Sequence, residues 1–423
     1  MARVNRRCCD HAHMTSDGGS AGRSLRCCFV LGNLAPDGAQ LSTVALAEEL
    51  PRHGVRPILV VLERHPDEVT DGARKQGVDV RVLHGRSRGQ WLRELRSIVV
   101  RERIDVLVTA MPYADLIGRL AALITRRPVV SSFVDTFTYV DYPHGFFDAG
   151  TVLRRRDRLV AWGIRASGRY ITDRWYATSP NVAHVNATAL RLLDRQVVAI
   201  ECGRGRPSPV LADPLAIERL RTELGMGAGV EMVLTLGRLH GVKGFDCLLD
   251  AWAIVSSDRH DLRLVLAGRD DGVEAELRQQ AERLGVTDSV RFAGHRDDVS
   301  TMLQAASVFV QTSHTEGGPA AAGEAFAANT PVVMPRFQLQ AGMLRDGVEA
   351  LFVDPSDSHE LAAAILACVD PSPDAIEATA ARVVAAAGFF DEHLRIDGVA
   401  ARMAALYRDT ARNPHVPGKR RLR

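Results

Sequence analysis

Two successive series of short, almost uninterrupted apolar runs constrain this chain more than any other feature. The runs are rich in β-branched residues, and helix-length segments separate them. Strands that are apolar on both faces belong to parallel sheets covered by helices on each side. In the first series we expect strands at residues 25–31, 56–62, 78–83, 104–110, 128–134, 174–178 and 196–200, with helices at 39–53, 90–103, 114–125 and 152–169.

A second series follows a segment at 201–209 that is rich in Gly, Pro and Arg. We expect its strands at 230–236, 262–267, 289–292, 308–311, 331–334 and 350–353, and its helices at 245–255, 273–284, 298–305, 319–328, 358–368, 373–387 and 392–412. Two such series predict an α/β fold with two doubly wound, Rossmann-like domains facing each other across a cleft. Ligands of such sheets bind beyond the carboxyl ends of the strands.

The same pattern gives the domain boundaries. We predict a disordered N-terminal extension at 1–24, a first domain at 25–203, a second at 204–388, a C-terminal helix at 389–412 and a basic tail at 413–423. The Gly-Arg-Gly-Arg-Pro sequence at 203–207 follows a strand but opens no helix, so a flexible hinge explains it better than a phosphate-binding loop.

Charge and cysteine content exclude several other classes. The formal net charge of +2 gives no general attraction to nucleic acid. The seven cysteines form neither a disulfide framework nor a CxxC zinc motif, and the Cys8, Cys9, His11 and His13 group lies in the extension. No apolar run reaches the length of about 18 residues that spans a bilayer, and no signal-peptide core is present, so we expect a cytoplasmic protein.

The first candidate site is the loop after the strand at 230–236. Arg238 and Lys243 lie on it, where the next helix begins and its free amides favour an anion. An arginine fork and a lysine point charge together suit a diphosphate, particularly a leaving one. The alternative is a site without function, in which Arg238 pairs with a nearby carboxylate and Lys243 is merely exposed. Lysine occurs only at Lys75, Lys243 and Lys419 among 53 basic residues, which favours a function for Lys243.

The second candidate site follows the strand at 308–311. Gly317 and Gly318 form a loop before Pro319, a favourable first helical residue, so their amides face a ligand at a helix N-terminus. Glu316 stands at the mouth of this loop and Glu324 eight residues later on the helix. Two carboxylates so placed accept hydrogen bonds from two sets of hydroxyls. A capping Glu316 and a surface Glu324 are the alternatives.

These residues carry a family resemblance. The second domain resembles retaining nucleotide-sugar glycosyltransferases of the GT-B fold, glycosyltransferase family 4, also called glycosyl transferases group 1. The similar elements are Gly237-Arg238-Leu239 with Lys243-Gly244, the Glu-x7-Glu spacing from Glu316 to Glu324, Phe292-Ala293-Gly294 before Asp298, and, in the first domain, Asp37-Gly38-Ala39-Gln40, Ala177-Thr178-Ser179 and Cys202-Gly203.

The resemblance implies specific roles. The first domain would be the acceptor side and the second the nucleotide-sugar side, with Arg238 and Lys243 on the diphosphate and Glu316 on the sugar as the catalytic set. The implied sugar-donor-binding residues are Gly38, Gly237, Arg238, Lys243, His295, Arg296, Glu316, Gly317, Gly318 and Glu324. Among them Gly38 would approach from the first domain, Glu324 would hold the ribose, and His295 and Arg296 would lie near the nucleobase.

The chain also departs from the family pattern. Where many relatives carry a histidine after the strand at 128–134, this chain has Ser-Phe-Val-Asp, and Asp135, Asp141 or His144 are the available substitutes. The usual Gly-Gly after the strand at 331–334 is replaced by Pro335-Arg336-Phe337-Gln338. These differences concern the acceptor and the identity of the sugar.

Two further clusters of charged residues give weaker evidence for a functional site. The acid pairs Asp270-Asp271 and Asp297-Asp298 are better explained as helix N-caps than as a magnesium site, so we expect no metal. The arginine-rich segment at 154–169 is best explained as a solvated face; peripheral membrane contact is compatible with it but not indicated.

The sequence and the family resemblance therefore predict a glycosyltransferase. It would transfer a sugar from a nucleoside-diphosphate sugar to a hydroxyl acceptor with retention, without a metal and without a cofactor. The acceptor is left open among a polysaccharide, a lipid carrier and a small metabolite. A non-catalytic sugar-nucleotide-binding regulator or assembly partner is the alternative, and a phosphorylase or epimerase on the same fold is a third.

Overall fold

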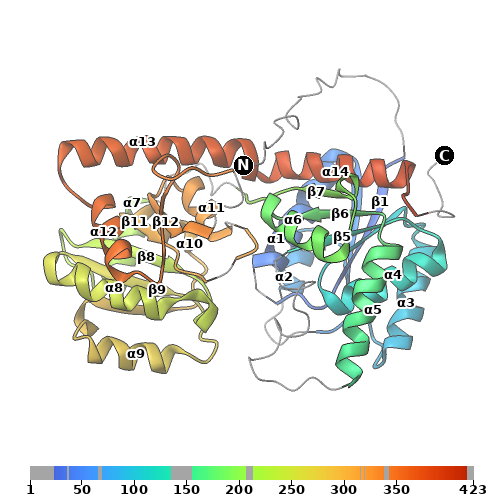
Figure 1. The fold of residues 1–423 in the computed structure, drawn as a ribbon, viewed down its shortest axis with the longest axis horizontal. Coiled ribbons are helices and arrows are strands. Elements are labelled where there is room, and N and C mark those ends of the chain that lie inside the picture. The colour runs from blue at the N-terminus through green and yellow to red at the C-terminus, as the bar shows by residue number, and fades with distance from the viewer. Residues whose placement is uncertain are drawn as a thin grey trace.

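In the computed structural model the chain forms two α/β bodies that lie side by side (Figure 1). The structure describes residues 23–35, 38–64, 69–134, 155–205, 213–314, 316–318, 320–337 and 343–416. Most of the predicted N-terminal extension, with Cys8, Cys9, His11 and His13, lies outside the described residues, as do Asp37, Pro319 and the three substitutes at 135, 141 and 144.

The first body contains a seven-stranded parallel sheet in the order β3-β2-β1-β4-β5-β6-β7. Its strands are β1 (Leu25–Leu31), β2 (Val55–Val61), β3 (Val80–Val82), β4 (Val106–Thr109), β5 (Val129–Phe133), β6 (Arg174–Ala177) and β7 (Val197–Ala199). Its helices include α1 (Gly38–Glu49), α2 (Thr70–Lys75), α3 (Arg88–Arg101), α4 (Pro112–Thr125), α5 (Arg155–Ile171) and α6 (Pro180–Leu190).

The central strand β1 shows why these runs are apolar throughout. Cys27 and Phe29 pack into a core with α1 and α2, whereas Cys28 and Val30 pack into another core with α3 and α4. Successive side chains of a strand point to opposite faces, so a sheet covered on both sides needs apolar residues at every position.

The second body contains a six-stranded parallel sheet in the order β10-β9-β8-β11-β12-β13. Its strands are β8 (Glu231–Leu236), β9 (Leu262–Ala267), β10 (Val290–Gly294), β11 (Val308–Val310), β12 (Val332–Pro335) and β13 (Leu351–Val353). One core contains residues of α8 (Phe245–Asp258), α9 (Glu274–Arg283) and α12 (Ser358–Cys368), and the other contains residues of α7 (Pro214–Glu223), α10 (Val299–Ala305), α11 (Ala320–Ala327) and α13 (Pro373–Phe389).

The two-sheet α/β architecture predicted from the apolar runs is confirmed, and every expected strand is present with small shifts at its ends. The helices α2, α6 and α7 were not anticipated. The last helix, α14 (Ile396–Arg412), starts later than expected because a π-helical turn at Phe390–Leu394 precedes it. At that turn Arg204 N donates to Leu394 O at 2.8 Å, and Ile396 N donates to Arg204 O at 3.0 Å, so the connection between the bodies pairs with the returning chain.

Helix α14 returns to the first body, although it follows the second in sequence. It continues from the end of α13 across the upper side of the first body (Figure 1). Its Val399, Met403 and Tyr407 are buried in the same core as α1, and the Tyr407 ring meets Phe29 edge-on with centroids 5.9 Å apart. The chain therefore passes from one body to the other twice, once between β7 and α7 and once between α13 and α14.

Candidate active site

Two glycines bring the β8 and β9 loops together at the carboxyl end of the second sheet. Gly237 follows β8 with a φ of 155°, and a Cβ on Gly268, which follows β9, would overlap the Gly237 carbonyl oxygen. Glycine is therefore required at 268 by close approach and favoured at 237 by its backbone conformation. This packing places Arg238 at the sheet edge. A glycine directly after an apolar strand is the sequence signal that marks Gly268.

A third glycine joins the Lys243 turn to the β11–α11 loop. Gly244 adopts the left-handed conformation with a φ of 64°, and a Cβ there would overlap Thr312 O. Thr312 Oγ1 donates to Lys243 O at 2.9 Å, and His314 N donates to Val242 O at 2.9 Å. The two loops predicted from separate motifs thus form one surface.

Within that surface Lys243 and Glu316 form an ion pair between Nζ and Oε1. Ser313 Oγ donates a hydrogen bond to the same carboxylate oxygen at 2.7 Å. The Lys243 side chain keeps 24% of its exposure and that of Glu316 18%, so both remain partly accessible. The sequence assigned these two residues to different parts of one ligand, and the structure places them in contact.

Arg238 forms an ion pair with Asp271, with Nη1 2.7 Å from Oδ2. This is the pairing that the sequence had offered as the structural alternative. Both side chains are more than a third exposed, and such pairs contribute little to stability. A ligand phosphate can therefore compete for the guanidinium at small cost.

Glu324 lies on α11 and faces the other body. Its Oε1 is 3.0 Å from Nε of Arg204, and a second nitrogen of that guanidinium pairs with Ser42 on α1. Arg204 Nη2 also approaches Gly38 O at 3.5 Å. Burial raises the pKa of Glu324, and the positive charge of Arg204 opposes that shift.

The expectation of a flexible hinge at 203–207 does not hold for Arg204, while residues 206 and 207 lie outside the described residues. The arginine is buried, with 8% of its surface exposed, and it connects α1 to α11. No sequence feature distinguishes Arg204, because arginine is abundant throughout this chain.

The glycine loop before α11 also touches the first body. Thr178 Oγ1, just after β6, donates to Gly317 O at 2.5 Å, and a Cβ on Gly318 would lie 3.6 Å from Thr178 Cβ. Gly38, Gly317, Gly318 and Glu324 thus gather at the contact between the bodies. Thr178 had been noted only as part of a family-like segment.

Arg296 and His295, the two residues expected near a nucleobase, differ in how far other side chains engage them. Arg296 makes two hydrogen bonds to Asp298, at 2.8 and 2.7 Å, and also pairs with Glu223 of α7. The adjacent guanidinium lowers the pKa of Asp298. Arg296 is therefore already engaged between α7 and α10. His295 is exposed and lies 3.4 Å from Asp297.

The two acid pairs, Asp270-Asp271 and Asp297-Asp298, also differ in the contacts that they make. Asp270 lies three residues before Val273, the N-cap of α9, and its Oδ1 accepts from the amides of Gly272, Val273 and Glu274 at 2.9–3.1 Å. Asp298 occupies the N-cap position of α10, as expected, but its side chain makes no capping hydrogen bond and its carboxylate binds Arg296 instead.

The carboxyl end of the first sheet is less polar. A pocket of about 50 Å³ opens there, lined among others by Gln40, Ser42, Met111, Tyr176 and Cys202. Burial raises the pKa of both Tyr176 and Cys202, so neither is an ionised nucleophile at neutral pH.

The fold matches that of solved two-domain GT-B glycosyltransferases. Anabaena HepE in complex with UDP and glucose superposes with a TM-score of 0.73 at 22% identity, covering 90% of this chain and 99% of that one. Sucrose-phosphate synthase from Thermosynechococcus elongatus gives 0.71 at 19% identity, covering 91% and 98%. At these identities the likeness establishes the fold.

Sequence comparison names the family. Residues 216–380 match the glycosyl transferases group 1 model, and residues 36–203 match the Glycosyltransferase Family 4 model. The chain belongs to the group 1 glycosyltransferases of the GT-B fold.

Among curated relatives, the lipopolysaccharide core biosynthesis glycosyltransferase LpsE of Rhizobium meliloti is 37% identical over 231 residues, 49% of this chain and 64% of the relative. The D-inositol 3-phosphate glycosyltransferase of Segniliparus rotundus is 29% identical over 270 residues, 63% of this chain and 56% of the relative. The matches therefore span less than two thirds of these relatives. Within the described residues, no helix has the length and apolar character needed to cross a bilayer.

Proposed function

We propose that this protein transfers a sugar from a nucleoside-diphosphate sugar to a hydroxyl acceptor, with retention of anomeric configuration. The observation that carries the proposal is the convergence of Arg238, Lys243 and Glu316 on one glycine-built surface at the carboxyl end of the second sheet. The solved relative HepE, with UDP and glucose bound, supports a nucleotide sugar as the ligand class.

In this proposal the ion pair between Lys243 and Glu316 changes partners when the sugar donor binds. The diphosphate takes Lys243, and the released Glu316 carboxylate accepts hydrogen bonds from sugar hydroxyls. Arg238 leaves Asp271 for the same diphosphate. As the glycosidic bond breaks, negative charge grows on the leaving phosphate, and the two cations stabilise it where it develops. The leaving phosphate receives the acceptor proton, so no side-chain base is needed.

Glu324 supplies the second recognition element. We assign its carboxylate to the ribose hydroxyls of the nucleotide, with Arg204 orienting it from the side of the first body. Because the Arg204 guanidinium also contacts Ser42 and Gly38 O, nucleotide binding at Glu324 is linked to the position of α1.

We propose that transfer requires no metal and no cofactor. Arg238 and Lys243 supply the positive charge that a divalent cation would otherwise bring to the diphosphate. The nearby Asp270 and Asp298 carboxylates are already engaged by backbone amides and by Arg296. The transfer rate should be the same with and without added Mg²⁺ or Mn²⁺; a rate that depends on either ion would contradict this part of the proposal.

A nucleotide-sugar screen tests the function. Sugars carried on UDP, GDP and ADP are added to the protein, and the shift in melting temperature is measured, because a ligand that binds only the folded state raises its apparent stability. Each stabilising compound is then assayed for hydrolysis and for transfer to hydroxyl acceptors, and the anomeric configuration of the product is read by NMR. Binding without turnover on any acceptor would favour the sugar-nucleotide-binding regulator. No binding would overturn the proposal.

A further inference from the structure

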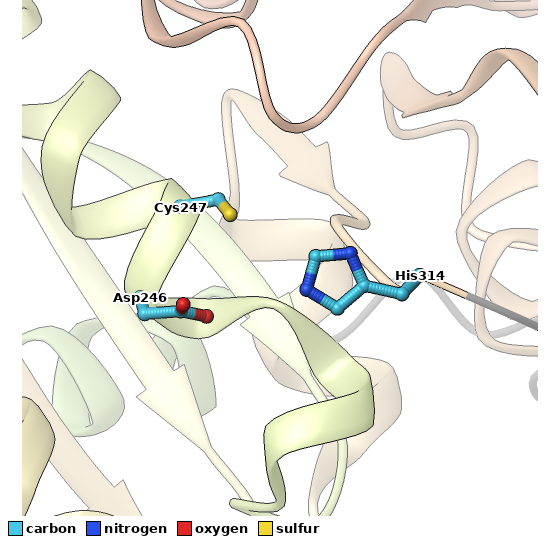
Figure 2. A group of neighbouring side chains, drawn as sticks. All are labelled: Asp246, Cys247 and His314. Carbon is cyan, nitrogen blue, oxygen red and sulfur yellow. The ribbon is translucent and has the colours of Figure 1, made fainter.

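A mixed group of metal-ligand side chains lies beside the candidate active site. Asp246, Cys247 and His314 each offer one ligand atom, and these atoms all lie within 4.8 Å of one another. Figure 2 shows the Cys247 sulfur and the Asp246 carboxylate at the first turn of α8 and the His314 ring approaching them from the β11–α11 loop. The residues come from segments more than 60 positions apart in sequence.

Backbone contacts hold the three side chains in this arrangement. The left-handed Gly244 precedes α8, and a Cβ there would lie 3.4 Å from His314 Nε2. The hydrogen bond from His314 N to Val242 O fixes the other segment. The same loop packing that builds the candidate active site therefore brings the three ligand atoms together before any ion binds.

The three groups are available for a ligand. Within the described residues, neither the Asp246 carboxylate nor the His314 ring takes part in a hydrogen bond or an ion pair with another side chain. Asp246 and His314 are exposed and Cys247 is partly exposed, so an ion has a path from solvent.

The local charge also favours a cation. Burial raises the pKa of the Cys247 thiol, and Asp246, Asp250 and Asp354 add to that shift because each disfavours a further negative charge. A divalent cation at this position would offset the acidic surroundings.

We propose that Asp246, Cys247 and His314 bind one divalent cation of the zinc type. Sulfur, imidazole nitrogen and carboxylate oxygen are the three ligand kinds that Zn²⁺ accepts, and three protein ligands leave a fourth, open position for water. Mg²⁺ and Ca²⁺ prefer oxygen ligands and do not suit this set. The site is distinct from the proposed transfer chemistry. Its ion fastens the start of α8 to the loop that carries Glu316, two residues after His314.

The experiment uses the full chain, stripped of metal and titrated with Co²⁺ as a spectroscopic stand-in for Zn²⁺. We expect a thiolate-to-cobalt charge-transfer band with visible absorption typical of four-coordinate Co²⁺, abolished by added Zn²⁺ and unaffected by Mg²⁺. Cys247→Ser should abolish the band. His314→Ala should reduce Zn²⁺ affinity by more than the roughly 10- to 100-fold that changes around a metal site cause without removing a ligand.

A matched control separates this site from the other cysteine–histidine stretch. The double variant Cys8→Ser/Cys9→Ser should keep the band and the affinity of the parent. Circular dichroism of each variant checks that the fold is retained, and Asp246→Asn, an exposed near-isosteric change, gives a second test through weakened Zn²⁺ binding. The proposal is overturned if the parent shows no thiolate band, if the band survives Cys247→Ser, or if only the Cys8→Ser/Cys9→Ser variant loses it.

Discussion

The carboxyl ends of the two sheets use charge in opposite ways. Under the first sheet, Arg119 and Asp115 form an ion pair that is completely buried, with nitrogen and oxygen 3.1 Å apart. The guanidinium also donates to Ser131 and lies over the Trp175 ring at 4.8 Å. At the second sheet, Lys243 pairs with Glu316 and keeps 24% of its exposure.

The difference teaches which ion pairs can change partners. A buried pair cannot separate without leaving an uncompensated charge in a low-dielectric interior, so Arg119 and Asp115 stay paired. A partly exposed pair separates at small cost, because water and ligand oxygens replace the lost partner. The charged pair at the carboxyl end of the second sheet is therefore suited to ligand binding, whereas the buried pair at the first sheet is suited to a structural role.

The largest effect is expected from breaking the buried pair. Asp115→Ala leaves Arg119 without its carboxylate and should lower the free energy of unfolding by about 3–5 kcal/mol. Urea denaturation measures this change. The exposed pair between Asp71 and Arg74 provides the control, and Asp71→Ala should cost at most about 1 kcal/mol. Equal losses in the two variants would remove the distinction between support and binding.

Removing a charge from the second edge should affect activity instead. Lys243→Ala and Arg238→Ala are each expected to reduce transfer by about two to three orders of magnitude, the usual effect of losing one preorganised group that stabilises developing charge. Their unfolding midpoints should stay close to that of the parent. Lys75→Ala, at the exposed end of α2, is the matched lysine control. Activity within a few-fold of the parent in both site variants would refute the assignment.

The two glutamates should fail in different ways. Glu324→Gln is expected to weaken binding of both the free nucleoside diphosphate and the whole sugar donor by about tenfold, because an amide loses the stronger charge-assisted hydrogen bonds to ribose. Glu316→Gln should spare the free nucleotide and depress transfer, since its proposed partner is the sugar alone. Calorimetric titration of both variants with both ligands makes the comparison. Equal weakening of the free nucleotide would show that the glutamates share one structural role.

The smallest effect concerns the pH dependence of stability. Burial raises the pKa of Glu324 above its ordinary 4.5, so the folded protein holds this proton more tightly than the unfolded chain. The contribution to stability is therefore full below pH 4.5 and is lost as the pH rises through the raised pKa. Glu324→Gln should remove this decline, measured by urea denaturation from about pH 4 to about pH 8. The exposed Glu276→Gln should leave it intact; a parent curve that matches the Glu324→Gln curve would contradict the shift.

The sequence alone determined the two sheets and the two charged loops. Apolar runs that repeat along the chain specify buried parallel strands, and the glycines after them mark the edge where ligands bind. Arg238, Lys243, Glu316 and Glu324 are predicted as site residues in this way, because each lies within a few residues of a strand end or a helix start.

Only the tertiary structure decided which distant residues meet. The return of α14 to the first body, the Arg204 contact with Glu324 and the approach of His314 to Cys247 each join segments separated by more than 60 positions. Local periodicity carries no information about such pairs, since it reports only which face of an element is buried. Their geometry follows from how two packed bodies and their crossing segments fill space together.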